Sequence, residues 1–307
     1  MKELINMSKV LVLATNIERY IGNTNGAITE IYRNNTQNKL IRLLRKLFFS
    51  ISFMPQIWLN TWYKNCSAYD AIVLFDTGNA KFLINIIRKK VPGAKIILWY
   101  WNSVEKTLPV KDIDRSKCEI WSYNKRDCKK YGLQYNTQFY INHIKQDLNI
   151  NIKQDVYFVG ADKNRTELLY NLQQVFEKKK ITYKFILTQA GRSKESKVKY
   201  SNPITAEENI KNILESYAII DLVDDNQKSG ITLRPFEAAY YKKKLITNDK
   251  TVKTLKFYSQ NNIFIVGIDS FESLKEFIAS PFVEHNVENL LYYEYSNWLK
   301  RFLEMRG

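Results

Sequence analysis

The sequence has few of the residues that form disulfides or bind zinc. It contains only three cysteines and two histidines in 307 residues. The cysteines, Cys66, Cys118 and Cys128, are odd in number and show no CxxC or Cys/His spacing. This excludes a disulfide framework and a zinc site of the usual kind. We therefore expect a protein of a reducing compartment, the cytoplasm.

Long hydrophobic runs are also missing. The longest apolar stretch, residues 47–59, is interrupted by Ser50, Ser52, Pro55 and Gln56, and it is shorter than the roughly 20 residues that cross a bilayer. The first 15 residues, MKELINMSKVLVLAT, show no continuous apolar stretch with a small-residue cleavage site. We expect neither a membrane-spanning segment nor a signal peptide.

Acidic residues are outnumbered. Asp and Glu total 31 against 47 Lys and Arg, which gives a net charge of +16 and favours polyanionic partners: nucleic acid, anionic lipid or phosphorylated substrates. The chain shows no recognition helix, RNP strand or zinc finger, so we do not expect it to bind nucleic acid. A basic protein that binds nucleic acid or anionic lipid without being an enzyme stays open as an alternative.

Apolar strands alternate with helical patterns in the first half of the chain. With 45% hydrophobic residues, 307 residues can bury two cores. A helix is predicted to begin at residues 28–32, and another covers 82–87. The expected strands are 9–15, 71–75, 95–99 and 119–122. Nearly all-apolar strands that alternate with helices indicate a parallel sheet covered on both faces.

The same alternation restarts near residue 155. A capping box, Thr205 to Glu208, opens a helix with Ile210, Ile213, Leu214 and Tyr217 on one face. Other helices are expected at 168–176 and 235–241, and strands at 155–160, 183–187, 218–223, 245–247 and 263–266. We predict an α/β protein with two Rossmann-like doubly wound domains, residues 1–150 and 151–307. A terminal helix, 288–305, is expected to pack back on the first domain.

The stretch from Gln227 to Asn248 carries the strongest chemical pattern. A glycine loop opens a helix there, and the unpaired N–H groups of a helix N-terminus attract phosphate. Thr232 offers a hydroxyl donor, Arg234 a forked cation, and Glu237 a carboxylate for the hydroxyls of a ribose. In the alternative reading, Ser229 and Thr232 cap the helix, Arg234 is solvated and Glu237 only complements the helix dipole.

This stretch resembles the donor-site motif of GT-B glycosyltransferases. It is more closely similar to a group of bacterial capsule and O-antigen enzymes. The matching residues, in order, are Gln227, Gly230, Thr232, Leu233, Arg234, Glu237, Lys244, Leu245, Ile246, Thr247 and Asn248. Where many retaining members carry a further glutamate, this chain has Ser229.

The resemblance implies two domains that face each other across a cleft, with a nucleotide-sugar donor in the second. It implies a hexosyltransferase of capsule, O-antigen or lipopolysaccharide biosynthesis, whose acceptor is a glycan or an undecaprenyl-diphosphate-linked sugar. The nucleotide-diphosphate sugar is then a substrate, and no cofactor is expected. A nucleotide-sugar epimerase or phosphorylase of the same architecture is the alternative enzyme.

A second group of charged residues follows the strand 155–160. Asp162, Lys163 and Arg165 stand at the head of a helix, where cations can neutralise a leaving diphosphate; the alternative is a solvated helix start. We find no DxD motif at a strand end, since Asp224–Asp225 and Asp112–Asp114 read as loop residues. We therefore expect a metal-independent reaction.

The expected catalytic base lies in the first domain. Asp76 ends the strand 71–75 at the carboxyl edge of the sheet, where ligands of α/β folds collect. In the alternative reading, Asp76 caps the following helix through Asn79. His143 is the second candidate for the base.

Residues 39–51 follow an amphipathic helical pattern. Its apolar residues are Leu40, Leu43, Leu44, Leu47, Phe48 and Ile51, and its basic residues are Lys39, Arg42, Arg45 and Lys46. A basic amphipathic helix of this kind can lie in a lipid headgroup layer. We expect Arg42, Arg45, Lys46 and Phe48 to hold the protein on the inner face of the cell membrane. The alternative is a surface helix that covers the core of the first domain.

Overall fold

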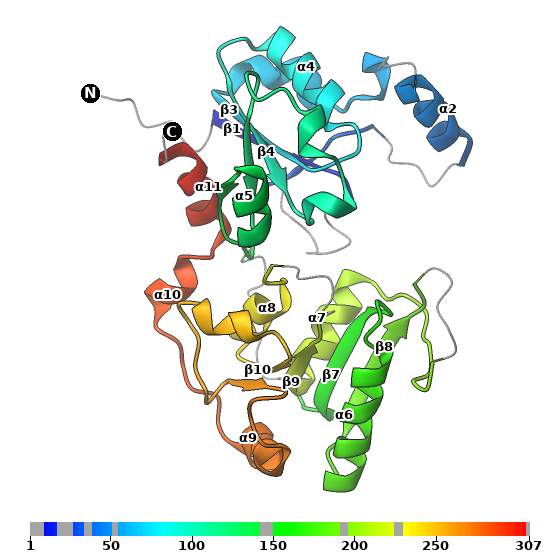
Figure 1. Cartoon of the computed structure of the whole chain (residues 1–307), viewed down its shortest axis with the longest axis vertical. Coiled ribbons are helices and arrows are strands. Elements are labelled where there is room, and N and C mark those ends of the chain that lie inside the picture. Colours follow the sequence, from blue (N-terminus) through cyan, green and yellow to red (C-terminus); the bar gives the residue numbers. More distant parts are fainter. Residues whose placement is uncertain are drawn as a thin grey trace. The chain divides into compact units, whose positions relative to one another are not determined.

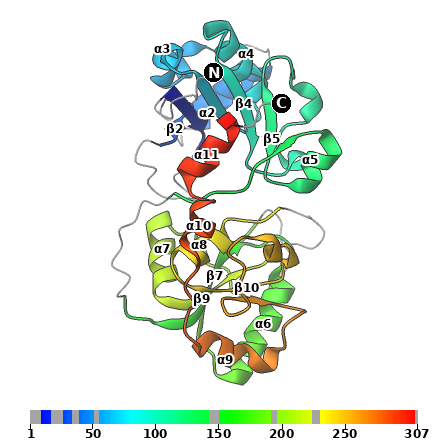
Figure 2. The ribbon, with the colours of Figure 1, turned by 90° about the vertical axis from the view of Figure 1, so that its left-hand side faces the viewer.

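The computed structural model describes residues 9–16, 27–33, 39–50, 55–141, 150–190, 196–223 and 230–304, without the side chains of residues 39, 42, 45, 46, 49 and 50. The chain forms two compact units (Figures 1 and 2). Unit 1 comprises residues 1–137 and 298–307, and unit 2 comprises residues 138–297. The boundary predicted from the sequence lies after residue 150, whereas the first unit ends its long segment at residue 137.

Unit 1 contains a parallel sheet of six strands in the order β2-β1-β3-β4-β5-β6. The strands are β1 (Val10–Ala14), β2 (Thr29–Glu30), β3 (Ala71–Phe75), β4 (Lys95–Tyr100), β5 (Glu119–Ser122) and β6 (Gln134–Tyr135). The direction of winding reverses between β1 and β3, which makes the sheet doubly wound. Its helices are α2 (Lys39–Ser50), α3 (Trp62–Asn65), α4 (Ala80–Lys90), α5 (Lys125–Tyr131) and α11 (Tyr295–Glu304), and the 3-10 turns are η2 (Gln56–Trp58), η3 (Cys66–Ala68), η4 (Val104–Lys106) and η5 (Val110–Asp112).

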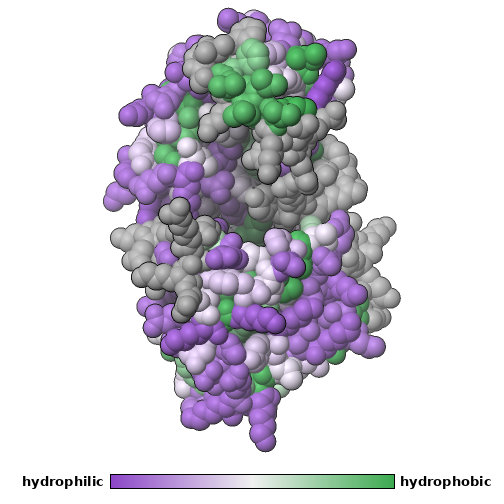
Figure 3. All heavy atoms as spheres, turned by 90° about the vertical axis from the view of Figure 1, so that its right-hand side faces the viewer, coloured by the Kyte–Doolittle hydropathy of each residue, from purple (hydrophilic) through white to green (hydrophobic). Residues whose placement is uncertain are grey.

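The helix α2 leaves large apolar side chains in solvent. Leu40 is 70% exposed, and Leu43, Leu44 and Leu47 are each about half exposed. Figure 3 shows hydrophobic atoms gathered on the surface of the first unit. The alternative reading, in which this face covers the core of the first domain, is therefore wrong, because a covering helix buries its apolar stripe.

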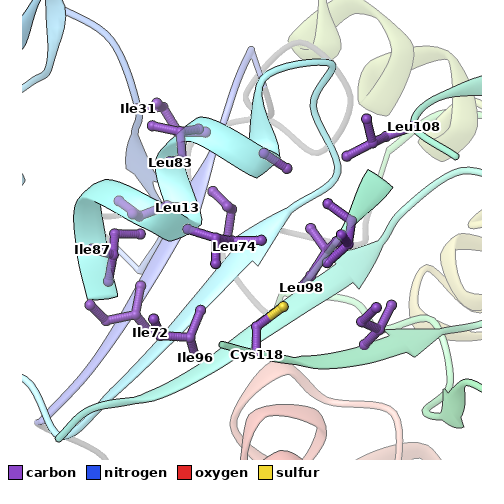
Figure 4. Packing of buried hydrophobic residues seen from close by; sticks show 14 of the residues in the cluster. Leu13, Ile31, Ile72, Leu74, Leu83, Ile87, Ile96, Leu98, Leu108 and Cys118 are labelled. Atoms are coloured by element: carbon purple, nitrogen blue, oxygen red, sulfur yellow. The ribbon is translucent and has the colours of Figure 1, made fainter. Parts of the chain in front are cut away.

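The core of unit 1 lies on both faces of its sheet. On one face, Leu83, Ile84 and Ile87 of α4 pack on alternate strand residues such as Leu74 and Leu98 (Figure 4). On the other face, Trp298 and Phe302 of α11 contact Trp99 of β4, with ring centroids 5.5 and 5.6 Å apart. Apolar residues on both faces of each strand make this burial possible.

Unit 2 contains a parallel sheet of five strands in the order β11-β10-β9-β7-β8. The strands are β7 (Gln154–Ala161), β8 (Tyr183–Thr188), β9 (Ser216–Asp221), β10 (Lys244–Thr247) and β11 (Ile263–Ile265). The helices are α6 (Thr166–Lys179), α7 (Ala206–Leu214), α8 (Arg234–Tyr240), α9 (Leu274–Ala279) and α10 (Val287–Leu291), with 3-10 turns η6 (Lys250–Thr254) and η7 (Phe271–Ser273). One hydrophobic cluster joins α7 and α8 to the sheet and another joins α6 and α9 to it, so helices cover both faces.

The predicted α/β class and the two doubly wound sheets are confirmed. Three local predictions are wrong. Residues 28–32 form the edge strand β2 and its flanks, because Thr29 and Glu30 pair with β1 and the N–H of Ile31 donates to the carbonyl oxygen of Ala14. Tyr217 belongs to β9 and is half exposed, so it does not continue the apolar face of α7. The expected helix 288–305 is two helices, α10 and α11, divided at residues 292–294.

Candidate functional site

The topology of unit 2 marks one edge of its sheet. Strands β7 and β9 are neighbours, and the helices that follow them, α6 and α8, belong to different hydrophobic clusters. In open parallel sheets, ligands bind at the carboxyl ends of the strands where the winding reverses. We call the residues at this point the β7–β9 edge: Gly160, Asp162, Arg165, Asp221, Thr232, Arg234 and Glu237.

Arg165 is the N-cap residue of α6, and its side chain extends from there across the β7–β9 edge. Its Nε donates to the carbonyl oxygen of Ala161 at 2.9 Å, and its Nη1 donates to the carbonyl oxygen of Leu222 at 2.5 Å. The guanidinium also lies over the ring of Phe158, 5.5 Å from its centroid. A Cβ at Gly160 would stand 2.8 Å from Nη2, so the missing side chain leaves the space that the guanidinium occupies.

Asp221 is the buried carboxyl group at the end of β9. It is only 4% exposed, and its Oδ2 accepts a 2.8 Å hydrogen bond from the hydroxyl of Thr232. Burial raises the pKa of Asp221 to about 6, against the lowering effects of Thr232, Arg234 and Arg165. Both arginines therefore lie within electrostatic reach of one carboxyl group at the β7–β9 edge.

Arg234 and Glu237 form an ion pair one turn apart on α8. Both side chains are about one-fifth exposed, and the backbone N–H of Arg234 donates to the hydroxyl of Thr232 at 3.2 Å. Burial is the largest effect and lowers the pKa of Arg234, but Glu237, Tyr157 and Asp221 together raise it above its usual value, so this guanidinium stays charged. The alternative reading of Arg234 as a solvated side chain is wrong.

The predicted phosphate cradle at the start of α8 stays a prediction. This helix has only seven residues, and its N-cap, Leu233, provides no side-chain cap. Gly230 precedes it and is partly exposed. Thr232 holds Asp221 and the first N–H of the helix together, so it joins the end of β9 to α8.

Asp162 and Lys163 take different positions in the loop between β7 and α6. Asp162 is buried, and its carboxylate accepts a 2.7 Å hydrogen bond from the hydroxyl of Tyr200. Its N–H donates to the carbonyl oxygen of Thr188 at the end of β8. Lys163 is exposed. Asp162 therefore fixes the loop to β8, and Arg165 is the residue of this group that reaches β9.

Asp76 lies at the carboxyl edge of the sheet in unit 1, as its place after β3 predicts. Its Oδ1 accepts from the backbone N–H of Trp101 at 2.9 Å, and its Oδ2 from the backbone and side-chain N–H groups of Asn102 at 3.4 Å. Asn79 caps α4 without a side-chain hydrogen bond, so Asp76 bridges β3 to the loop after β4 rather than capping α4. Burial raises its pKa to about 6, and the hydrogen bonds oppose this shift.

Other predicted residues lie outside the part of the chain that the structure describes. These are His143, Gln227 and Ser229, and the side chains of Arg42, Arg45 and Lys46. The ring of Phe48 is described and contacts that of Trp58, with centroids 5.1 Å apart. Within the described ranges, no three His, Cys, Asp or Glu residues cluster so as to hold a metal ion.

Two residues of the β7–β9 edge were missed in the sequence. Asp221 lies inside the predicted strand 218–223 and is followed by the apolar residues Leu222 and Val223, so no local pattern shows that β9 ends at it. The importance of Gly160 cannot be predicted from the sequence, because it depends on the position of the Arg165 guanidinium in the folded protein.

Comparisons with known proteins give similarity in structure only. No protein-family model matches the chain, and no curated protein matches its sequence. A sucrose-phosphate synthase from Thermosynechococcus elongatus resembles it with a TM-score of 0.46 and 8% identity, over 95% of this chain and 96% of that one. The glycosyltransferase of kitacinnamycin resembles it with a TM-score of 0.41 and 9% identity, over 90% of this chain and 84% of that one. A structure described as a UDP-N-acetylglucosamine 2-epimerase from Listeria monocytogenes resembles it with a TM-score of 0.39 and 9% identity, over 79% of this chain and 81% of that one.

Proposed function

We propose that the chain is a metal-independent glycosyltransferase that binds a nucleotide-sugar donor at the β7–β9 edge. The observation that carries the proposal is the convergence of Arg165 and Arg234 on Asp221 at the point where the winding of the sheet reverses. Two arginines there give a diphosphate the cations it needs as a leaving group, in place of a divalent ion. The acceptor we propose is a sugar of a surface glycan, linked to a lipid diphosphate.

Glu237 is suited to the ribose of the donor. A carboxylate offers about four lone-pair positions, so Glu237 can keep its ion pair with Arg234 and still accept hydrogen bonds from two vicinal hydroxyls. The ion pair also couples the two proposed contacts, because Arg234, which would bind the phosphate, is held in place by Glu237, which would bind the ribose. Loss of either side chain then disturbs both contacts.

Asp76 is suited to activate the acceptor hydroxyl. A pKa of about 6 leaves its carboxylate mostly ionised at neutral pH yet basic enough to take a proton. Trp101, whose backbone N–H donates to Asp76, is partly exposed, and its ring centroid lies 5.4 Å from that of Phe75. Tyr123, which follows β5, feels the Asp76 charge, because burial and then that charge raise its pKa. A carboxylate among aromatic faces suits a sugar, whose C–H groups pack on rings while its hydroxyls need an acceptor.

The proposal is tested by measuring nucleotide binding in Arg234→Ala and Glu237→Ala. We expect each variant to lower the affinity for one of UDP, GDP, CMP or dTDP by about 1.5 to 3 kcal/mol, the worth of a charged hydrogen bond. A thermal-shift screen identifies the nucleotide, and calorimetry gives the affinity. Lys242→Ala and Glu284→Ala are matched controls, because they break an exposed ion pair of the same unit and should leave binding unchanged.

Turnover is then followed with the sugar nucleotide that binds, in excess EDTA and with a sugar acceptor. Product that depends on the acceptor and persists in EDTA is expected. Wild-type affinity in both folded variants would show that the donor lies elsewhere. Donor breakdown or epimerisation without any acceptor product would replace the transferase by the epimerase or phosphorylase alternative.

A further inference from the structure

The surface of α2 carries a continuous apolar patch. Leu40, Leu43, Leu44 and Leu47 are 70, 55, 49 and 55% exposed, and Ile57 in η2 is 72% exposed. Single exposed leucines are ordinary on a protein surface, but the spacing of these four, three and four residues apart, puts them on one stripe of the helix. Figure 3 shows hydrophobic atoms gathered on one face of the first unit. Contiguous apolar surface of this kind marks an interaction site.

The helix is held to unit 1 by a different part of its circumference. Phe48 is partly buried, and its ring meets the edge of the Trp58 ring at 5.1 Å. At 100° per residue, Phe48 lies beyond Leu44 at one border of the apolar stripe. The leucines therefore stay at the surface while the helix keeps an aromatic contact at that border.

The charge of α2 has one sign. The helix contains Lys39, Arg42, Arg45 and Lys46 and no acidic residue. Helical spacing places these four positions together on the arc that the leucines leave. A helix with an apolar stripe and an arc whose only charged positions are basic matches a lipid surface, which is anionic at the headgroups and apolar beneath them.

We propose that α2 lies in the headgroup layer of an anionic lipid membrane and holds unit 1 there. Leu40, Leu43, Leu44 and Leu47 would enter the boundary between headgroups and acyl chains, and the basic arc would meet lipid phosphates. None of the described helices is long and apolar enough to span a bilayer, so the contact is interfacial. The charge of the helix favours lipid over a second copy of this chain, which is itself strongly basic at +16.

The test is co-sedimentation of the full chain with vesicles of phosphatidylcholine, with and without phosphatidylglycerol. We expect binding only to the anionic vesicles and release at high salt, because headgroup fields decay within a Debye length. The triple variant Arg42→Glu, Arg45→Glu, Lys46→Glu should lower partitioning roughly a hundredfold, since each basic residue contributes about fivefold near the surface. Leu43→Gln with Leu47→Gln should lower it by at least about tenfold, through lost apolar contact.

Matched controls come from unit 2. Lys211, Lys253 and Lys275 are exposed, and their change to Glu alters net charge by the same amount. Val287 and Leu291 lie four residues apart on α10 and are 66 and 44% exposed, so their change to Gln removes similar apolar surface. Both controls should bind vesicles nearly as the wild type does.

Three results would overturn the proposal. The first is vesicle binding that both α2 variants retain while folded by circular dichroism. The second is absence of vesicle binding in the wild type. The third is a concentration-dependent dimer in light scattering that Leu43→Gln with Leu47→Gln abolishes without any effect of lipid, since the stripe would then be covered by a second copy. Because the readout is lipid binding and not turnover, failure here leaves the proposed transfer reaction standing.

Discussion

At the scale of single residues, Arg165 shows how one side chain joins two strands. Its guanidinium donates to carbonyl oxygens that follow or end β7 and β9, and charge-assisted bonds of this kind are stronger than neutral ones. The group is thus positioned before any ligand arrives. A cation that is already in place loses little conformational entropy when an anion binds.

Gly160→Ala tests this positioning without removing the charge. The added Cβ would stand 2.8 Å from Nη2 of Arg165 and 3.2 Å from the ring of Phe158. The flexible end of an arginine can move aside, so we expect a change in stability within about 1 kcal/mol. The displaced guanidinium should weaken nucleotide-diphosphate binding at least about tenfold in calorimetry.

Gly93→Ala is the matched control, because no atom lies within 4 Å of the Cβ it would add. It should leave nucleotide binding unchanged. If Gly160→Ala binds the nucleotide as tightly as the wild type does, Arg165 does not contact the ligand from its observed position.

Asp221 should make the stability of the protein depend on pH. Its pKa is about 6 in the folded state and 3.8 ordinarily, so between these values the folded state holds a proton that the unfolded state has lost. Stability is therefore greatest below about pH 4 for this group and falls as pH rises to about 6. About two pKa units correspond to roughly 3 kcal/mol at most.

Asp221→Asn removes this titration and keeps an oxygen for the Thr232 hydroxyl. We expect the variant to gain stability relative to the wild type as pH rises from about 4 to about 7, measured by urea unfolding at each pH. The difference should level off above the folded-state pKa of about 6. A stability difference that stays constant over this range would contradict a raised pKa at Asp221.

At the scale of helices and strands, the pattern of apolar residues predicts the position of most strands and helices. The mainly apolar stretches 71–75, 95–99 and 155–160 are strands, and the capping box at Thr205 and Glu208 opens α7 with both of its hydrogen bonds. These elements carry their own local signal, since strands buried on both faces are apolar throughout. Asp76 could be found in the same way, because it directly follows such a strand, whereas Asp221 lies inside the predicted strand 218–223.

Helices and strands that depend on contacts with residues distant in the sequence could not be predicted from local patterns. The short strand β2 has two residues and exists through its pairing with β1, which no local pattern shows. The division between α10 and α11 follows from pairing as well: Tyr140 exchanges two backbone hydrogen bonds with Tyr293 and Tyr295. Arg234 pairs with Glu237 only because α8 begins at Arg234.

At the scale of the whole molecule, the chain returns to unit 1 after it has completed unit 2. The last helix, α11, lies on the sheet of unit 1 (Figure 2). Arg301 donates to the side chains of Asn136 and Thr137 at 2.8 and 2.7 Å, and Lys95 donates to the carbonyl oxygen of Phe302 at 2.7 Å. Unit 1 is therefore complete only when both ends of its chain are present.

Trp298→Ala should destabilise unit 1 selectively. Trp298 is fully buried, and its ring lies 5.5 Å from Trp99, 6.1 Å from Phe75 and 4.7 Å from Phe302. Truncation of a buried tryptophan leaves a cavity that costs about 3 to 5 kcal/mol. Differential scanning calorimetry should show one transition moved to lower temperature, and a bound nucleotide should raise only the other, because it binds the folded unit 2.

Lys300→Ala is the control on the same helix. Its side chain is exposed and pairs with Glu304 at the surface, so its loss should change stability by no more than about 0.5 kcal/mol. Trp298→Ala that melts like the wild type would mean that α11 contributes little to unit 1. A variant in which both transitions fall together would mean instead that the two units unfold as one cooperative body, and the nucleotide would then raise the melting temperature of the whole chain.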